Sequence, residues 1–139
     1  ISSTALAADN STITATFSEA VFKSRSASGT GFAGNGDLEV SDFVLSMSGG
    51  VATLGSATPT SISKSSNAYT LCINYIGLPN GSEVITVIPA QDAIYDNTGN
   101  IASTTQSNNT KTFNSEKIRI AKSLEFETGY AQYLSLLKI

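Results

Sequence analysis

Residues 95–100, with the sequence YDNTGN, bring together the side chains of this chain that are best suited to bind a metal ion. Asp96, Asn97 and Asn100 supply carboxylate and amide oxygens, and Gly99 permits the positive backbone φ angle that would fold them together. Calcium binds about six to eight such oxygens in a flexible geometry. The same residues are typical of a plain turn, because Asn and Asp tolerate left-handed backbone and hydrogen-bond to their own main chain. The stretch therefore predicts a turn, which becomes a calcium site if further acidic residues lie near it.

One carboxylate is too few for a tight calcium site, so the number of strands decides which other acids approach Asp96. If residues 51–63 form one bent strand, the loop that contains Glu19 lies at the same end of the molecule as residues 95–100. Asp42 then faces Asp96 as well. This strand order is the one expected of an ordinary immunoglobulin-type sandwich.

Pro59 permits a second strand count, in which it splits residues 51–63 into two strands and the ends of the molecule exchange. Asp9 and Asn10 would then become the neighbours of residues 95–100. We favour the first count, because the split leaves only very short segments. The predicted calcium ligands are Asp96, Asn100, Glu19 and Asp42, with Asp37 or Glu39 as further neighbours.

Several kinds of chemistry lack their residues in this chain. It contains no His and no Trp, which excludes Ser-His-Asp and Cys-His catalysis, His-ligated zinc and Trp-based sugar platforms. The single cysteine, Cys72, cannot form an internal disulfide. Charged residues make up 14% of the chain and the net charge is −3, so we expect no nucleic-acid partner. No apolar run is long enough for a membrane span, and we expect no membrane insertion.

The elements that would position the loop are predicted to be short strands. Apolar and hydroxyl-bearing residues alternate in several stretches, which is typical of strands buried on one face. The predicted inward residues are Ile13, Ala15, Phe17, Phe43, Leu45, Met47, Tyr69, Leu71, Ile73 and Tyr75. Residues 83–88 are apolar on both faces and predict a central strand. Turn-forming Gly, Asn, Pro and Ser residues separate these stretches.

The chain is therefore predicted to be all-β, with an antiparallel immunoglobulin-like β-sandwich of about seven strands in residues 1–113 and an extra C-terminal segment in residues 114–139. Residues 22–37, which are rich in Gly and Ser, are predicted to be a long loop outside the strand pattern. One interpretation makes this loop a recognition element with Lys23, Arg25 and Phe32 as contacts. The other makes it a tolerated surface insertion.

Four phrases of the sequence, ALAADNSTITATFSEAV, LEVSDFVLSMSGGVATLGSATPTSIS, YTLCINYIGLPNGSEVITVIPA and IYDNTGNIASTTQSNNT, resemble the bacterial immunoglobulin-like repeats of large secreted and surface proteins. The resemblance covers roughly residues 1–113, with an FSE-type strand opening and a D-x-x-G-N close. It implies an extracellular β-sandwich at the cell surface, without enzymatic activity and often calcium-dependent. Its partners would be neighbouring repeat domains.

The tail from Asn114 onward has more charge, more Leu and Tyr, and fewer hydroxyl-bearing residues. Two roles fit it: it caps its own sandwich, or it inserts into an identical subunit by strand addition. Three functions therefore stand as expectations. The chain is a calcium-stiffened structural module, an adhesin tip that binds a surface glycan or protein, or a self-assembling filament subunit joined through the tail.

Overall fold

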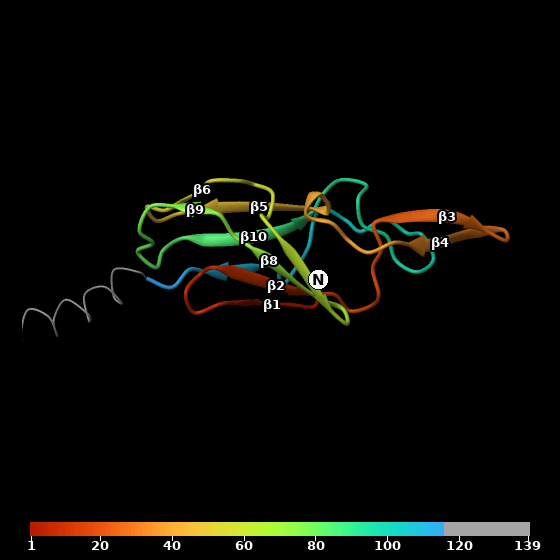
Figure 1. Ribbon diagram of the computed structural model, residues 1–139, viewed down its shortest axis with the longest axis horizontal. Helices are drawn as coiled ribbons and strands as arrows, with labels where there is room; N and C mark the ends of the chain where they lie inside the picture. The colour runs from red at the N-terminus through yellow and green to blue at the C-terminus, as the bar shows by residue number, and fades with distance from the viewer. Residues whose placement is uncertain (116–139) are drawn as a thin grey trace, which may run out of the picture.

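The computed structural model describes residues 1–115, and this part of the chain folds into antiparallel β-sheets (Figure 1). Two sheets form the body of the sandwich. The strands of the first sheet, in spatial order, are β1 (Ser3–Leu6), β2 (Thr12–Thr16), β8 (Ala68–Cys72) and β7 (Ile62–Ser65). The strands of the second sheet are β11 (Thr110–Thr112), β10 (Val84–Pro89) and β5 (Phe43–Ser48). A short 3-10 helix, η1 (Val40–Asp42), leads directly into β5.

Two small ribbons complete the fold. β6 (Thr53–Leu54) pairs with β9 (Tyr75–Ile76), and β3 (Ser24–Ser28) pairs with β4 (Gly31–Asn35). Figure 1 shows the β3–β4 hairpin projecting beyond one end of the body. The hairpin is thus not part of either sheet of the body, and contacts other than sheet pairing hold it in place.

The strands of the body follow from the alternation of apolar and hydroxyl-bearing residues. In β2, Ile13 and Ala15 are fully buried, whereas the threonines that alternate with them are half-buried on the other face. β2 pairs with β8 in a register that sets Ile13 opposite Leu71, which is also fully buried. Because successive side chains of a strand point to opposite faces, this register directs one apolar face of the sheet inward.

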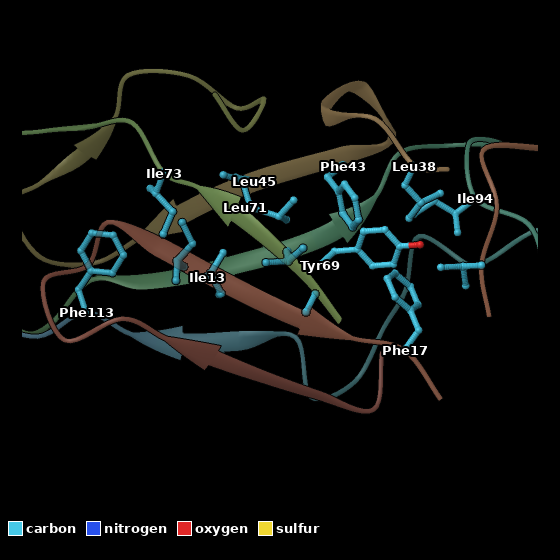
Figure 2. Close-up of a cluster of buried hydrophobic side chains, with 14 residues drawn as sticks. Ile13, Phe17, Leu38, Phe43, Leu45, Tyr69, Leu71, Ile73, Ile94 and Phe113 are labelled. Atoms are coloured by element: carbon cyan, nitrogen blue, oxygen red, sulfur yellow. The ribbon is translucent and has the colours of Figure 1, made fainter. Parts of the chain in front are cut away.

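The core lies between the two sheets, where their buried side chains meet (Figure 2). The ring of Tyr69 from β8 packs edge-on against Phe17 at 5.8 Å between centroids, and against Phe43 from β5 at 6.2 Å. Ile85 and Val87 of the central strand β10 are fully buried. Aromatic pairs of this kind contribute roughly 0.5–1.5 kcal/mol each beyond their burial, so this cluster joins the two sheets strongly.

The structure confirms the all-β prediction and the predicted inward residues. The central strand predicted at residues 83–88 is β10 (Val84–Pro89). One favoured prediction is wrong: residues 51–63 are not one bent strand. They divide into β6 and β7, which pair with different partners. Between them Ser56 closes a tight turn, donating its hydroxyl to the carbonyl of Thr58 and accepting the Thr58 N–H, and Pro59 supplies no N–H to continue a ladder.

The first and last strands of the sandwich, β1 and β11, have their outer ends at opposite ends of the molecule. β1 and β11 run side by side in the same direction, since Thr4 donates its hydroxyl to the carbonyl of Asn108 at 3.0 Å and Asn114 donates its N–H to Asn10 at 2.8 Å. We call the end that carries residues 18–37 and 95–101 the hairpin pole. We call the end that carries the turns at 7–11, 49–52 and 79–83 the Glu83 pole. β1 begins at the hairpin pole and β11 ends at the Glu83 pole.

The predicted C-terminal segment, residues 114–139, lies outside the described residues from residue 116 on. Its capping role and its strand-addition role therefore both stay predictions. Within residues 1–115, no helix has the length and apolar character that a membrane crossing requires.

Candidate functional site: the loop at residues 95–101 and the hairpin it holds

The loop that contains YDNTGN is a tight turn closed by its own hydrogen bonds. Tyr95 and Ile101 pair across it, and the Asp96 N–H donates to the carbonyl of Asn100 at 2.9 Å. One oxygen of the Asp96 carboxylate accepts the N–H groups of Thr98 at 2.8 Å and Asn100 at 2.9 Å, and the Thr98 hydroxyl at 2.9 Å. The other oxygen accepts the Asn100 side-chain amide at 2.8 Å. The predicted turn is confirmed, and a single carboxylate organises it.

These contacts favour the ionised form of Asp96. The side-chain and backbone donors of Asn100, assisted by those of Thr98, lower the pKa of the Asp96 carboxyl to about 2. The carboxylate is therefore charged over the whole neutral and mildly acidic range. Its donors are all groups of the same loop, so the charge acts to fix the loop's own shape.

The structure brings three of the four predicted calcium ligands together. Glu19, Asp96 and Asn100 line one surface hollow at the hairpin pole, together with the apolar residues Phe17 and Val21. Residues 51–63 form two strands, and with that number of strands the neighbours of residues 95–100 were predicted to be Asp9 and Asn10. The structure instead places Glu19 beside Asp96 and Asn100 in this hollow.

Asp42, the fourth predicted ligand, does not line this hollow. It is buried beside η1, where its carboxylate accepts the N–H of Glu39 at 2.7 Å, and burial raises the pKa of its carboxyl. Asp37 and Glu39, the further neighbours considered, pair with Lys64 and Lys23 on the surface. None of these three acids is among the residues that line the hollow with Asp96.

The arrangement of donors and acceptors bears directly on the calcium hypothesis. Among residues 1–115, no group of three or more His, Cys, Asp or Glu residues is placed to hold a metal ion. One oxygen of Asp96 already accepts three hydrogen bonds and the other accepts one, so a cation there would compete with the Thr98 and Asn100 donors for the carboxylate. Glu19 makes no hydrogen bond or ion pair within the described residues and remains the carboxylate of the hollow with free oxygens. Calcium binding at Asp96, Asn100 and Glu19 stays a prediction.

The turn also has a second role, because the projecting hairpin stands on it. Arg25 of β3 donates from Nη1 to the carbonyl of Gly99 at 2.8 Å. Gly34 of β4 donates its N–H to the carbonyl of Asn97 at 3.2 Å. Below these contacts, Phe22 and Tyr95 exchange two backbone hydrogen bonds of 2.8 Å each. The two strands of the hairpin are thus tied to the loop.

Arg25 is the centre of the contact between hairpin and loop. Its guanidinium carbon lies 4.4 Å from the ring centroid of Phe32 and 5.5 Å from that of Tyr95. A guanidinium stacked on aromatic rings gains roughly 0.5–1 kcal/mol at exposed sites, and its planar fork holds direction better than an ammonium does. Arg25 therefore fixes the direction of the hairpin as well as its attachment.

Gly99 allows this close approach. Its backbone φ is +81°, and a side chain there would begin 2.5 Å from Cβ of Phe32. Any other residue at this position would be strained in the backbone and would push the hairpin away. The glycine that suggested a calcium loop in the sequence thus serves the packing of the hairpin against the turn.

The hairpin itself meets water on both faces. All residues of β3 except Ser24 are exposed, and Phe32 of β4 retains 49% of its surface. Residues 20–36 contain Lys23 and Arg25 but no acidic residue, although the chain as a whole is acidic. The predicted loop at 22–37 is therefore an ordered hairpin. The two-residue turn at Gly29-Thr30 was the sequence signal for it, and the prediction missed that signal.

A second carboxylate, which sequence reasoning missed, organises the opposite pole. Glu83 is fully buried, and its oxygens accept the N–H groups of Val51 at 2.9 Å, Ala52 at 3.0 Å, Asn80 at 3.0 Å and Gly81 at 3.1 Å. Burial alone would raise the pKa of Glu83, but these backbone donors outweigh it and lower the pKa to about 2. An acid between a turn-forming stretch and an apolar strand was the only signal available in the sequence.

Comparisons of the chain with protein-family models, with curated proteins and with solved structures found no match. The path of the chain, the projecting hairpin and the two carboxylate-closed poles are therefore the features from which a function can be inferred. Both poles are closed by main-chain donors gathered around one acid, and within residues 1–115 the hairpin pole alone carries a projecting element.

Proposed function

We propose that residues 1–113 form a non-enzymatic structural module of an extracellular bacterial surface protein, joined in series to neighbouring repeat domains. The observation that carries this proposal is the shared direction of β1 and β11. A chain that arrives at one pole and departs from the opposite one extends a row of domains along its long axis. A chain that arrived and departed at the same pole would instead place its neighbours side by side.

The order of the strands also supports the proposal. The sheets β1-β2-β8-β7 and β11-β10-β5 have the order of the ABED and GFC sheets of a constant-type immunoglobulin sandwich. The hairpin β3–β4 is then an addition between the second and third strands of that arrangement. This order favours the resemblance to bacterial immunoglobulin-like repeats, which are domains of secreted and cell-surface proteins.

A spacer must keep its length, and the closed poles suit that role. At the hairpin pole Asp96 fixes the turn at 95–101, and at the Glu83 pole one buried carboxylate joins the turns at 49–52 and 79–83. Loops that gather their main-chain donors around a carboxylate have fewer conformations to explore. Calcium, if it binds Asp96, Asn100 and Glu19, would add to this rigidity rather than create it.

The test is the shape of two copies of the full chain fused in series, measured by small-angle X-ray scattering. We expect the longest dimension of the fusion to approach twice that of the single chain measured under the same conditions. A fusion whose longest dimension stays close to that of the single chain would mean that the copies lie side by side, and would contradict the serial arrangement.

A second candidate, an adhesin tip that binds a glycan or protein, is favoured by the hairpin alone. It presents Lys23, Arg25 and the half-exposed ring of Phe32 on an ordered element held in a fixed direction. Binding residues favour such projections on rigid scaffolds, and the absence of acids in residues 20–36 suits an acidic glycan. Retention on immobilised heparin that is lost in Lys23→Gln, and kept in the matched variant Lys111→Gln on β11, would support this function.

A further inference from the structure

The β6–β9 ribbon carries an apolar patch that faces water. Val51, Ile76 and Leu78 retain 58%, 63% and 39% of their surface, and the first two are the most exposed large apolar side chains of residues 1–115. We call these three residues the ribbon patch. Thr53 pairs with Ile76, and Val51 and Leu78 each lie two residues beyond this pair at the same end of the ribbon. A side chain placed at Gly77 would lie 3.7 Å from the carbonyl oxygen of Val51, so the two segments stay adjacent there.

The patch is a genuine outward face and not a frayed end. Ala52, which lies between Val51 and Thr53, points the other way and is 2% exposed. The backbone of Val51 and of Ala52 is held by the buried Glu83 carboxylate. The ribbon therefore presents its apolar residues in fixed positions, and large exposed apolar groups gathered in this way mark interaction sites.

The chain leaves the described fold next to this patch. A side chain placed at Gly81 would lie 3.4 Å from Cβ of Ser115, so Ser115 lies beside the turn at 79–83. Gly81 donates its N–H to the same Glu83 carboxylate that accepts the N–H of Val51. One carboxylate thus connects the point of departure of residues 116–139 to the edge of the ribbon patch.

We propose that the ribbon patch is the docking surface for residues 116–139 of the same chain. That segment carries apolar residues at every second or fourth position over its first half, namely Ile118, Ile120, Leu124 and Phe126, separated by charged and small residues. Such alternation gives an extended segment one apolar face. At roughly 3.3 Å per extended residue, its first ten residues reach about 30 Å from Ser115, far enough to cross the short ribbon.

A segment of the same chain is favoured over a second molecule by proximity. Because residues 116–139 start beside the patch, their effective concentration at it is of the order of millimolar, well above that of a separate molecule in dilute solution. The two arrangements differ in one measurable respect, since only the second depends on protein concentration.

The test is limited trypsin digestion of the full chain, with cleavage after Lys117, Arg119 and Lys122 followed by mass spectrometry. We expect Val51→Ser combined with Ile76→Ser to speed this cleavage roughly tenfold or more, because cleavage follows the population of the undocked segment. The matched control Val44→Ser removes an exposed apolar residue of β5, 39% exposed, and should leave the cleavage rate unchanged. Leu124→Ser combined with Phe126→Ser should speed cleavage as the patch variant does.

Three results would overturn the proposal. Cleavage as fast in the parent as in the patch variant would mean that the patch does not hold the segment. An equal acceleration by Val44→Ser would mean that the effect is not specific to the patch. Protection that disappears on dilution would assign the patch to a second copy of the chain, joined by exchange of the tail. The substituted residues are exposed, so unchanged thermal midpoints should accompany all of these measurements.

Discussion

Arg25 and Gly99, which are far apart in the sequence, meet at 2.8 Å where the guanidinium of one donates to the carbonyl of the other. This contact joins the projecting hairpin to the turn that Asp96 closes. It gives the YDNTGN stretch a role that needs no metal ion, because this turn forms the surface against which the hairpin packs.

Replacing Arg25 by Lys should loosen the hairpin without unfolding the body. Lysine keeps the charge but loses the planar group that stacks on Phe32 and the directed donor to Gly99. We expect faster amide hydrogen exchange in residues 24–35 and a global unfolding free energy lowered by no more than about 1 kcal/mol. The matched change Lys23→Gln, which breaks an exposed ion pair with Glu39, should leave the exchange of the hairpin nearly unchanged.

Replacing Glu83 by Gln should destabilise the whole body. In glutamine an NH2 group takes the place of one carboxylate oxygen, and this group cannot accept hydrogen bonds from the backbone N–H groups around it. Buried donors are then left without a partner. We expect the unfolding free energy, measured by urea denaturation, to fall by about 2–4 kcal/mol. Glu39→Gln on the surface serves as the control, and a Glu83→Gln chain as stable as this control would contradict the structural role of Glu83.

The stability of the chain should fall in acid. Glu83 has a pKa of about 2 in the folded chain, against 4.5 for an unperturbed Glu side chain such as that of the unfolded chain. Because the folded pKa is depressed, its contribution is complete above pH 4.5 and is lost as the pH falls toward 2, amounting to about 3 kcal/mol in full. Asp96, also lowered to about 2, adds loss in the same direction between its reference value of 3.8 and 2. Urea denaturation between pH 2 and 6 should show this fall, and Glu83→Gln should flatten it.

Much of the body could be predicted from the sequence. The alternation around Ile13 and Leu71 determines which faces turn inward, because the period of a strand leaves a one-sided apolar stretch only one way to be buried. The division of residues 51–63 could not be predicted in this way, since it depends on a Ser56 side chain that closes a local turn and on partners far along the chain.

The site was only partly predictable for a similar reason. Residue types placed Asp96, Asn100 and Gly99 in one turn, and the structure confirms that turn. Their use depends on contacts with Arg25 and Phe32, which no local pattern in the sequence announces. Glu83 was missed because an acid at the start of a strand is usually exposed, and only tertiary structure brings four main-chain donors to it.

Calcium should have a small effect if the turn closes as described. Because four hydrogen bonds from Thr98 and Asn100 compete with a cation for the Asp96 carboxylate, we expect millimolar calcium to raise the thermal midpoint of the parent chain little over its value in EDTA. A ligand present at about a hundred times its dissociation constant would stabilise by about 2.7 kcal/mol, which the melt would resolve. A rise of that size that disappears in Glu19→Gln would establish the predicted calcium site at Asp96, Asn100 and Glu19.

The most direct measurement is amide hydrogen exchange of the full chain and of Asp96→Ala, both in EDTA, with Glu19→Ala as the control from the same hollow. If the hydrogen bonds of Asp96 hold the turn in the shape that supports the hairpin, Asp96→Ala should speed exchange roughly tenfold or more in residues 97–101 and also in the hairpin at 24–35. The strands β2, β8 and β10 should keep their protection. Glu19→Ala should change neither segment. Faster exchange in residues 97–101 with an unchanged hairpin would contradict the account, because the hairpin would then stand without the turn.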